Sequence, residues 1–325
     1  DNSGRIVDGT TGNIIAKITS SSSEKYRFAF TAHVDTVKST RGIKPQINHE
    51  KIFTDKTTIL GADNRAGIAH ILFMIEFLKQ QNKPHLPFEA IFTIGEETGL
   101  YGSTHLDTDL VDSRTAYILD SSACPGSYVY MAPGALDFKI KLIGKSSHAA
   151  VDPAGGINAM IMASDLLRQF KVGKIDEFTT INFGTICGGE ANNVVPPEID
   201  LTGEIRSFKK DLIESHFVRL EQTLQSISTK FEGNYVLNGD HAFPGFMLDR
   251  KLEAIEHLDH AMENVNLKPN PIPYYGRSDA NILNNRGIVA IDLGIGAKNP
   301  HSPDEYILLE DMKTIADLCH QLVHV

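Results

Sequence analysis

The chain has 325 residues, of which 41% are hydrophobic and 22% charged, so it can bury a large core in one large or two medium domains. No apolar run reaches the roughly 18 residues of a membrane span. The sequence starts without a secretory signal, so we expect a cytoplasmic protein unless such a signal has already been removed. The formal net charge of −10 and the lack of a basic stripe argue against a nucleic-acid partner.

The first third of the chain alternates short apolar runs with apolar residues at helical spacing. Strands are predicted at residues 27–32, 88–94 and 115–119, and a helix at residues 65–80. This alternation is typical of a mostly parallel sheet with helices on both faces. Because ligands of such sheets gather at the carboxyl ends of the strands, residues that follow these strands are candidates for a site.

From Gly134 the pattern changes to that of a small α+β sandwich. It predicts strands at residues 136–143, 179–186 and 199–208, and helices at residues 157–170 and 211–231. A helix at residues 249–264 and a strand at residues 288–293 then resemble the first part again. We therefore predict one α/β domain, residues 1–133 and 245–325, interrupted by an inserted domain, residues 134–244.

Polar residues at two of the predicted strand ends could bind a metal ion. His33 and Asp35 lie two residues apart, so in an extended chain both side chains project to the same side and the carboxylate could orient the imidazole. Asp63 lies where a strand-like run joins the first predicted helix. It could bind a metal ion, or it could simply cap that helix.

Carboxylates also follow the other predicted strands. Asp120 comes directly after residues 115–119, and Glu96 and Glu97 follow residues 88–94. Adjacent carboxylates raise each other's pKa unless a cation or a catalytic role compensates. His301 lies between two prolines after the last predicted strand. Two histidines and three carboxylates suit zinc, or less well cobalt or manganese, and they can hold two ions if one carboxylate bridges them.

Four segments resemble metallopeptidase family M20, and within it the peptidase T and peptidase T-like group. They are residues 31–37 (TAHVDTV), 60–67 (LGADNRAG), 93–100 (TIGEETGL) and 144–149 (GKSSHA). Their order and spacing make a chance match very improbable, and the resemblance runs across nearly the whole chain. It implies a zinc-peptidase-like catalytic domain with an inserted lid domain.

The resemblance also implies a role for each candidate residue. His33 and Asp120 would hold one zinc ion, Glu97 and His301 the other, and Asp63 would bridge the two. Asp35 would brace His33, and Glu96 would be the general base.

In this family the lid domain supplies substrate contacts, which by motif position are His148, Asn193 and Arg206. Taken without the resemblance, His148 would be interpreted as a loop histidine with local hydrogen bonds.

The chain departs from the family pattern in three places. Asn64 stands where many relatives have a second Asp, and Arg277 stands where relatives usually have Gly. Arg277 could alter specificity or simply face solvent. The helical region that precedes the first strand in relatives is absent, so we expect a truncated or incompletely ordered chain.

The resemblance implies a dinuclear zinc metallopeptidase that hydrolyses short peptides from the N-terminus, as a tripeptide aminopeptidase does. Relatives often dimerise through the lid domain, so a homodimer is expected. The same metal centre would also serve an N-acyl amino acid deacylase or a carboxypeptidase-like amidohydrolase. An inactive binding module that kept the fold is the alternative from a different class.

Overall fold

A computed structural model describes residues 1–20, 28–81 and 84–324 and divides the chain into two compact units. The first unit comprises Asp1–Ala132 and Met247–Val325, and the second comprises Pro133–Phe246. Arg27, where the first strand was predicted to begin, lies outside the described residues. Within the described residues, no helix combines the length and the apolar character needed to cross a membrane.

The first unit is built on an eight-stranded sheet. Its strand order is β1-β5-β2-β6-β15-β7-β13, with β14 paired to β7. The bounds are β1 Ile14–Ile18, β5 Phe88–Thr93, β2 Phe28–His33, β6 Thr115–Ser121, β15 Val289–Gly294, β7 Ser127–Ala132, β13 Phe246–Met247 and β14 Asn270–Pro273. The strands β5, β2, β6 and β15 are mutually parallel, so their carboxyl ends meet at one edge of the sheet.

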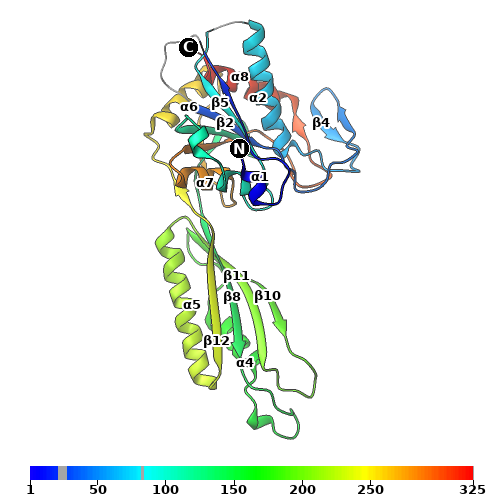
Figure 1. Cartoon of the computed structure of the whole chain (residues 1–325), viewed down its shortest axis with the longest axis vertical. Helices are drawn as coiled ribbons and strands as arrows, with labels where there is room; N and C mark the ends of the chain where they lie inside the picture. Colours follow the sequence, from blue (N-terminus) through cyan, green and yellow to red (C-terminus); the bar gives the residue numbers. More distant parts are fainter. Residues whose placement is uncertain (21–27, 82–83, 325) are drawn as a thin grey trace. The chain divides into compact units, whose positions relative to one another are not determined.

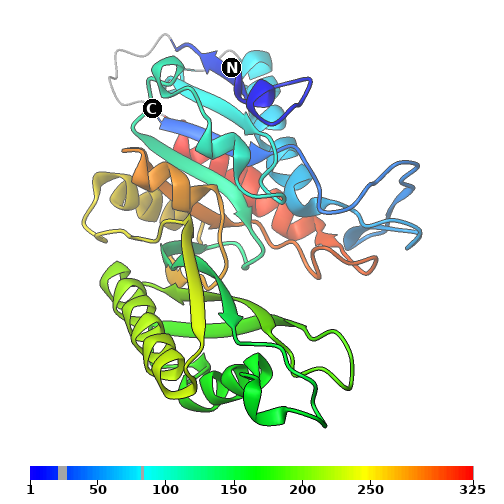
Figure 2. The same cartoon turned by 60° about the horizontal axis from the view of Figure 1, so that its bottom comes forward.

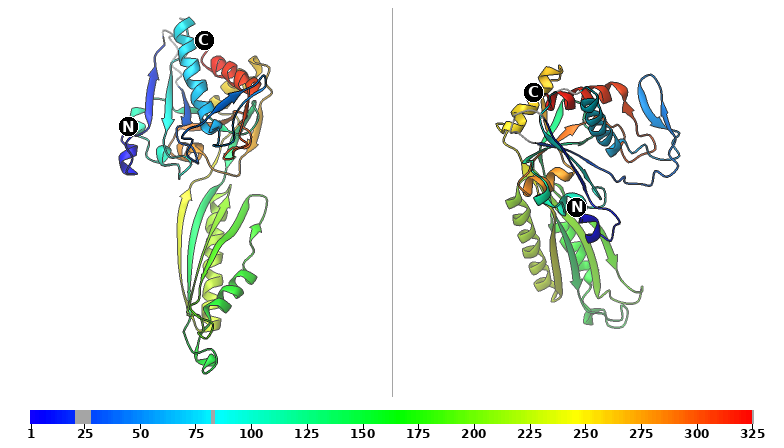
Figure 3. Two further views of the ribbon diagram at one scale, coloured as in Figure 1. Left: turned by 90° about the vertical axis from the view of Figure 1, so that its right-hand side faces the viewer. Right: turned by 45° about the horizontal axis from the view of Figure 1, so that its top comes forward.

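Helices cover both faces of this sheet, which confirms the predicted fold class. On one face α2 (Ala62–Gln81) packs against β2, β6 and α8 (Leu309–Leu322), and α6 (Glu253–Asn264) packs against α8 (Figures 1 and 3). On the other face α7 (Asp279–Asn285) packs against β15. Because both faces are covered, every residue of β2 and β5 is buried.

A three-stranded sheet, which the sequence did not predict, lies beside this core. It consists of β3 (Pro45–Ile47), β4 (Lys51–Thr54) and β16 (Ile307–Leu308), in the order β16-β4-β3. A further short helix of the unit is α3 (Tyr101–Thr104), which packs against α7.

The second unit is a five-stranded antiparallel sheet with two helices (Figure 2). The strand order is β12-β8-β11-β10-β9, with bounds Asn234–Phe243, Gly134–Ile143, Glu198–Ser207, Thr179–Gly188 and Gly173–Lys174. The helices are α4 (Ala159–Gln169) and α5 (Lys210–Phe231), and their apolar sides share one core with the sheet. This core forms because side chains alternate along the strands, for example in β8, where Phe138 and Ile140 are buried and Lys139 between them is exposed.

Candidate metal centre

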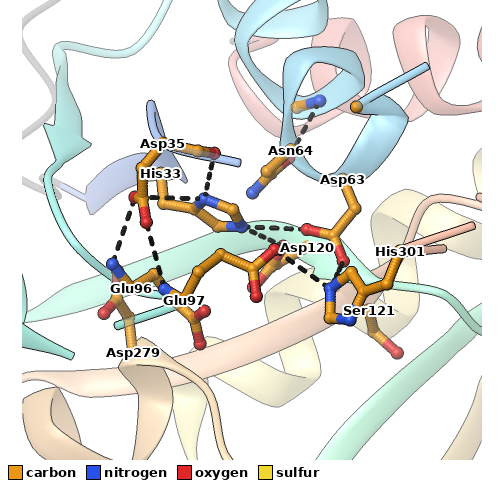
Figure 4. Close-up of polar contacts among 12 residues, drawn as sticks. His33, Asp35, Asp63, Asn64, Glu96, Glu97, Asp120, Ser121, Asp279 and His301 are labelled. Carbon is orange, nitrogen blue, oxygen red and sulfur yellow. Dashed lines mark hydrogen bonds and ion pairs between the residues drawn. The ribbon is translucent and has the colours of Figure 1, made fainter. Parts of the chain in front are cut away.

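His33 lies at the end of β2, and its side chain is only 2% exposed. Its Nδ1 lies 3.0 Å from the backbone oxygen of Asp35, which can only accept, so Nδ1 carries a proton, and in the neutral imidazole that binds metals Nε2 offers a lone pair. That Nε2 lies 2.9 Å from Oδ1 of Asp63 and 3.4 Å from Oδ1 of Asp120 (Figure 4). Lone pairs of one nitrogen and two carboxylate oxygens therefore converge, as they do around a bound cation.

Asp63 also belongs to a second group of converging ligand atoms. Its Oδ2 lies 3.3 Å from Nε2 of His301, which in turn lies 3.0 Å from Oε1 of Glu97. This buried Glu97 oxygen has no hydrogen-bond partner in the part of the chain that the structure describes. In each of the two groups, all ligand atoms lie within 4.8 Å of one another. The five residues thus fit two metal ions that share the Asp63 carboxylate.

The first turn of α2 shows why Asp63 is free for this role. Asn64, and not Asp63, caps the helix, because its Oδ1 accepts a hydrogen bond from the backbone N–H of Gly67 at 3.1 Å. Asp63 has φ −82° and ψ 101°, outside the helical range, and its side chain points to the histidines. The alternative in which Asp63 merely caps the helix is therefore wrong.

The loop after β5 carries Glu96 and Glu97, and Asp35 holds it in place. One Asp35 carboxylate oxygen accepts from the backbone N–H of Glu96 at 3.1 Å, and the other accepts from that of Glu97 at 3.1 Å. The predicted contact between Asp35 and His33 is present at 3.5 Å, although the tighter bond of His33 goes to the backbone oxygen of Asp35. Asp35 therefore ties the end of β2 to the loop of the two glutamates.

Charge at this site is one-sided. The candidate ligands form ion pairs with one another, through His33 and His301. Burial, followed by the charges of Asp120 and Asp279, raises the pKa of Glu96 to about 10. Burial also raises the pKa of Asp120. Two divalent ions would supply the positive charge that these carboxylates lack.

The structure brings together two of the three residues predicted to contact substrate from the inserted unit. The backbone N–H of Ala149, next to His148, donates to the backbone oxygen of Asn193 at 2.9 Å. Nδ1 of His148 accepts from the backbone N–H groups of Ala150 and Val151 at 3.3 and 3.2 Å. The proton of His148 therefore lies on Nε2, which can act as a donor.

Arg206, the third of these residues, lies at the opposite end of the same sheet. It pairs in register with Ala135 near the start of β8, whereas Glu198, beside the loop of His148, pairs with Ile143 at the end of β8. The run of β11 between Glu198 and Arg206 spans roughly 26 Å at the usual rise of a strand. Within one chain, Arg206 and His148 therefore cannot contact the same small substrate.

Two further buried acids near the site were not predicted from the sequence. Glu305, four residues after His301, accepts hydrogen bonds from the loop that carries Asp63. Asp279 accepts from the hydroxyl of Thr93 at 2.6 Å and is 2% exposed. The only sequence signal for Glu305 is that it lies four residues after His301. The signal for Asp279 is that it lies two residues after Arg277.

Two family models match successive parts of the chain. Residues 13–127 match the model described as peptidase family M28, and residues 130–236 match the M20 peptidase dimerisation domain. The first range contains four of the five candidate ligands, and the second contains the predicted substrate contacts of the inserted unit.

Solved structures and a curated sequence are similar over nearly the whole chain. The aminopeptidase PepT of Bacillus cereus has a TM-score of 0.95 and 31% identity, and the match covers 99% of this chain and 87% of that one. A tripeptidase of Staphylococcus aureus has a TM-score of 0.94 and 30% identity, with 99% and 86% covered. The uncharacterized protein YqjE of Bacillus subtilis is 32% identical over 289 residues, which are 89% of this chain and 78% of that protein.

Proposed function

Because the chain belongs to the peptidase T group of metallopeptidase family M20, we propose that it is a dinuclear zinc aminopeptidase that hydrolyses short peptides from the N-terminus. The observation that carries the proposal is the pair of ligand groups that share Asp63, with Glu96 beside them and outside both. The likeness to an aminopeptidase and a tripeptidase, at 31% and 30% identity, supports the substrate class.

In this proposal the five candidate ligands divide between two zinc ions. His33 and Asp120 hold one ion, Glu97 and His301 hold the other, and Asp63 bridges them. Imidazole nitrogens and carboxylate oxygens are the ligands that catalytic zinc sites use, and cobalt or manganese would suit them less well. Bound zinc would supply Lewis acidity, which polarises the scissile carbonyl and lowers the pKa of water to near 7.

Glu96 is the proposed general base. It belongs to neither ligand group, so both of its oxygens are free to move protons. It takes a proton from the attacking water and returns it to the amine that leaves. Asp35 holds the Glu96 backbone through the hydrogen bond at 3.1 Å, which fixes the position of this base relative to the ligands.

The inserted unit is proposed to serve two active sites in a homodimer. Arg206 and His148 lie at opposite ends of the sheet of this unit, so we expect each to serve a different site. We expect Nε2 of His148 to donate to the oxyanion formed from the scissile carbonyl in the second copy.

Two features of the inserted unit support such a dimer. Among the described residues, β9 pairs only with Thr180 and Ile181, which leaves the rest of this side of β10 as an open edge that another chain can join. Large apolar side chains are also exposed in the same unit, among them Met160 at 50%, Ile161 at 54% and Ile186 at 51%.

A mixing experiment tests the shared site. Glu96→Gln and His148→Ala chains are each expected to be inactive as homodimers. When the two are unfolded and refolded together, on the order of a quarter of the wild-type activity should return, because half of the dimers are mixed and each mixed dimer contains one complete site. A mixture no more active than its separate components would place His148 and Glu96 of one chain at the same site.

A substrate panel tests the proposed specificity. Free tripeptides, N-acetylated peptides and N-acyl amino acids should be compared with zinc, cobalt and manganese added in turn. Release of the free N-terminal residue from tripeptides, without cleavage of blocked peptides, is the expected result. Hydrolysis of blocked substrates alone would instead favour a deacylase or a carboxypeptidase, and no hydrolysis with any metal would favour a binding module.

A further inference from the structure

Glu305 links two loops that are far apart in the sequence. Its side chain lies in the loop between β15 and β16, the residue is 1% exposed, and both of its oxygens accept hydrogen bonds. Oε2 accepts from the backbone N–H of Gly61 at 2.6 Å, and Oε1 accepts from that of Asp63 at 3.1 Å. One carboxylate therefore holds the turn that carries the shared ligand Asp63 through two hydrogen bonds.

The turn at Gly61 is shaped for this grip. Gly61 has φ +65°, and a Cβ there would lie 2.6 Å from Nη1 of Arg65 and 2.9 Å from Cγ2 of Thr36. Glycine is the residue that adopts this positive φ without strain and places no Cβ against these two side chains. The turn can therefore direct the Gly61 N–H at Glu305.

The loop of Glu305 also carries His301. Lys298 and Tyr306 close this loop through two reciprocal backbone hydrogen bonds of 2.8 and 3.1 Å. Inside it, the N–H of Glu305 donates to the backbone oxygen of Ser302 at 3.0 Å. His301 is 47% exposed and has φ +64°, so neither burial nor a strand fixes its imidazole. The hydrogen bonds of Glu305 therefore link the loop of His301 directly to the turn of Asp63.

Asp35 performs the same task on the other side of the cluster. It accepts from the consecutive N–H groups of Glu96 and Glu97, as Glu305 accepts from Gly61 and Asp63. Four of the five segments that carry candidate ligands are thus tied in two pairs, each by one carboxylate that is not itself a candidate ligand.

We propose that Glu305 is a positioning residue that holds Asp63 and His301 at the separation needed for the ion they share with Glu97. The inference rests on the proposed dinuclear centre. The proposal predicts different effects on the two ions, because two ligands of the first ion, His33 and Asp120, lie on strands of the sheet, whereas these hydrogen bonds of Glu305 go to the turn of Asp63. Loss of the Glu305 hydrogen bonds should weaken the binding of the second ion far more than that of the first.

Substitution of Glu305 by glutamine separates this role from simple filling of space. The Glu305→Gln variant would keep the size of the side chain, but its amide NH₂ would face a backbone N–H that needs an acceptor. Asp304→Asn is a matched control, because this neighbouring acid is 63% exposed and pairs with Lys56 at the surface. Both variants remove one negative charge from the same loop.

The test is a titration of metal-free protein with Co²⁺, followed by visible absorption, with bound metal counted separately. Glu305→Gln should bind the first ion like the wild type and the second about 10- to 100-fold more weakly, with an altered spectrum for the second ion. Asp304→Asn should match the wild type. At saturating Co²⁺, kcat of Glu305→Gln should fall below that of the wild type by a smaller factor than the affinity for the second ion does. Its KM should equal that of the wild type.

Each other outcome has a defined meaning. If Glu305→Gln binds both ions like the wild type, the positioning role is wrong. If it does not fold, Glu305→Asp, which keeps the charge on a shorter side chain, is titrated instead, and failure of both to fold even with metal shows a general structural role and rejects the proposal. If the wild type itself binds fewer than two ions, the dinuclear centre fails, whatever the variants do.

Discussion

The two halves of the candidate metal centre are built on different scaffolds. In one half His33 ends β2 and Asp120 lies within β6, so paired neighbouring strands hold both ligands. In the other half Glu97 and His301 lie in loops. The histidines differ accordingly, with 2% of the His33 side chain exposed and 47% of that of His301. The carboxylates do not differ, because Asp120 is 11% exposed and Glu97 8%.

The comparison shows where preorganisation comes from in each half. Sheet hydrogen bonds hold the His33 half whether or not an ion is bound. The His301 half depends on side-chain hydrogen bonds, those of Asp35 to the Glu97 loop and those of Glu305 to the Asp63 turn. We therefore expect the first half to bind its ion more tightly and the second to respond more strongly to changes outside the ligand set.

The largest effect is expected where the two halves meet. Asp63→Ala removes the shared ligand, so both ions should be lost and hydrolysis should fall on the order of 1000-fold or more. Glu96→Gln should also lose about 100- to 10,000-fold in kcat, but with both ions retained. Metal counting beside a peptidase assay distinguishes the two losses.

The fold of Asp63→Ala provides the control for this prediction. Asn64 caps α2, so the helix should survive the substitution, and circular dichroism should match the wild type. A folded Asp63→Ala protein that keeps two ions would show that Asp63 does not bridge them.

A smaller and more selective effect is expected from the two histidines. His301→Ala should lose only the second ion and leave a protein with one ion per chain. His33→Ala removes a ligand that is held by the sheet, so it should lose the tighter ion and also weaken the second through Asp63, which contacts both histidines. Titration with Zn²⁺ against a chelator measures both affinities, and equal losses in the two variants would contradict the difference between the halves.

The sequence identified the candidate ligands as a group because of where they lie along the chain. His33 and Asp120 lie at the ends of strands, Glu97 follows one and Asp63 begins a helix, all at one edge of a parallel sheet, and the structure brings them together with His301. The sequence also identified the peptidase T group and the α/β fold, both of which the comparisons confirm.

The supporting contacts could not be predicted, because they depend on the folded backbone. Glu305 accepts from N–H groups 244 and 242 residues earlier in the chain, and no local pattern announces such a pairing. The separation of His148 from Arg206 likewise needed the strand register, since motif positions give residue types and not their place along a sheet.

The smallest predicted effect concerns the stability of the metal-free protein. Burial raises the pKa of Glu96 to about 10, so the native state holds a proton that the unfolded chain releases near pH 4.5. Burial lowers the pKa of His33, but Asp120, Asp35 and Asp63 outweigh it, and the pKa lies well above 6.5. In both cases the native state binds more protons, so stability should fall as pH rises through this range, by up to about 1.4 kcal/mol per pH unit for each excess proton.

Thermal unfolding of the chelated protein between about pH 5 and about pH 9 measures this trend. The melting temperature should fall with rising pH, and added Zn²⁺ should reverse the fall, because bound cations replace the protons as the source of positive charge. His33→Asn should make the melting temperature less dependent on pH above pH 6.5, since it removes the proton that His33 binds in the native state. A metal-free wild type that becomes more stable as pH rises would show that its carboxylates are ionised and already balanced by positive charge of the protein itself. That result would remove the electrostatic argument for two cations at this cluster.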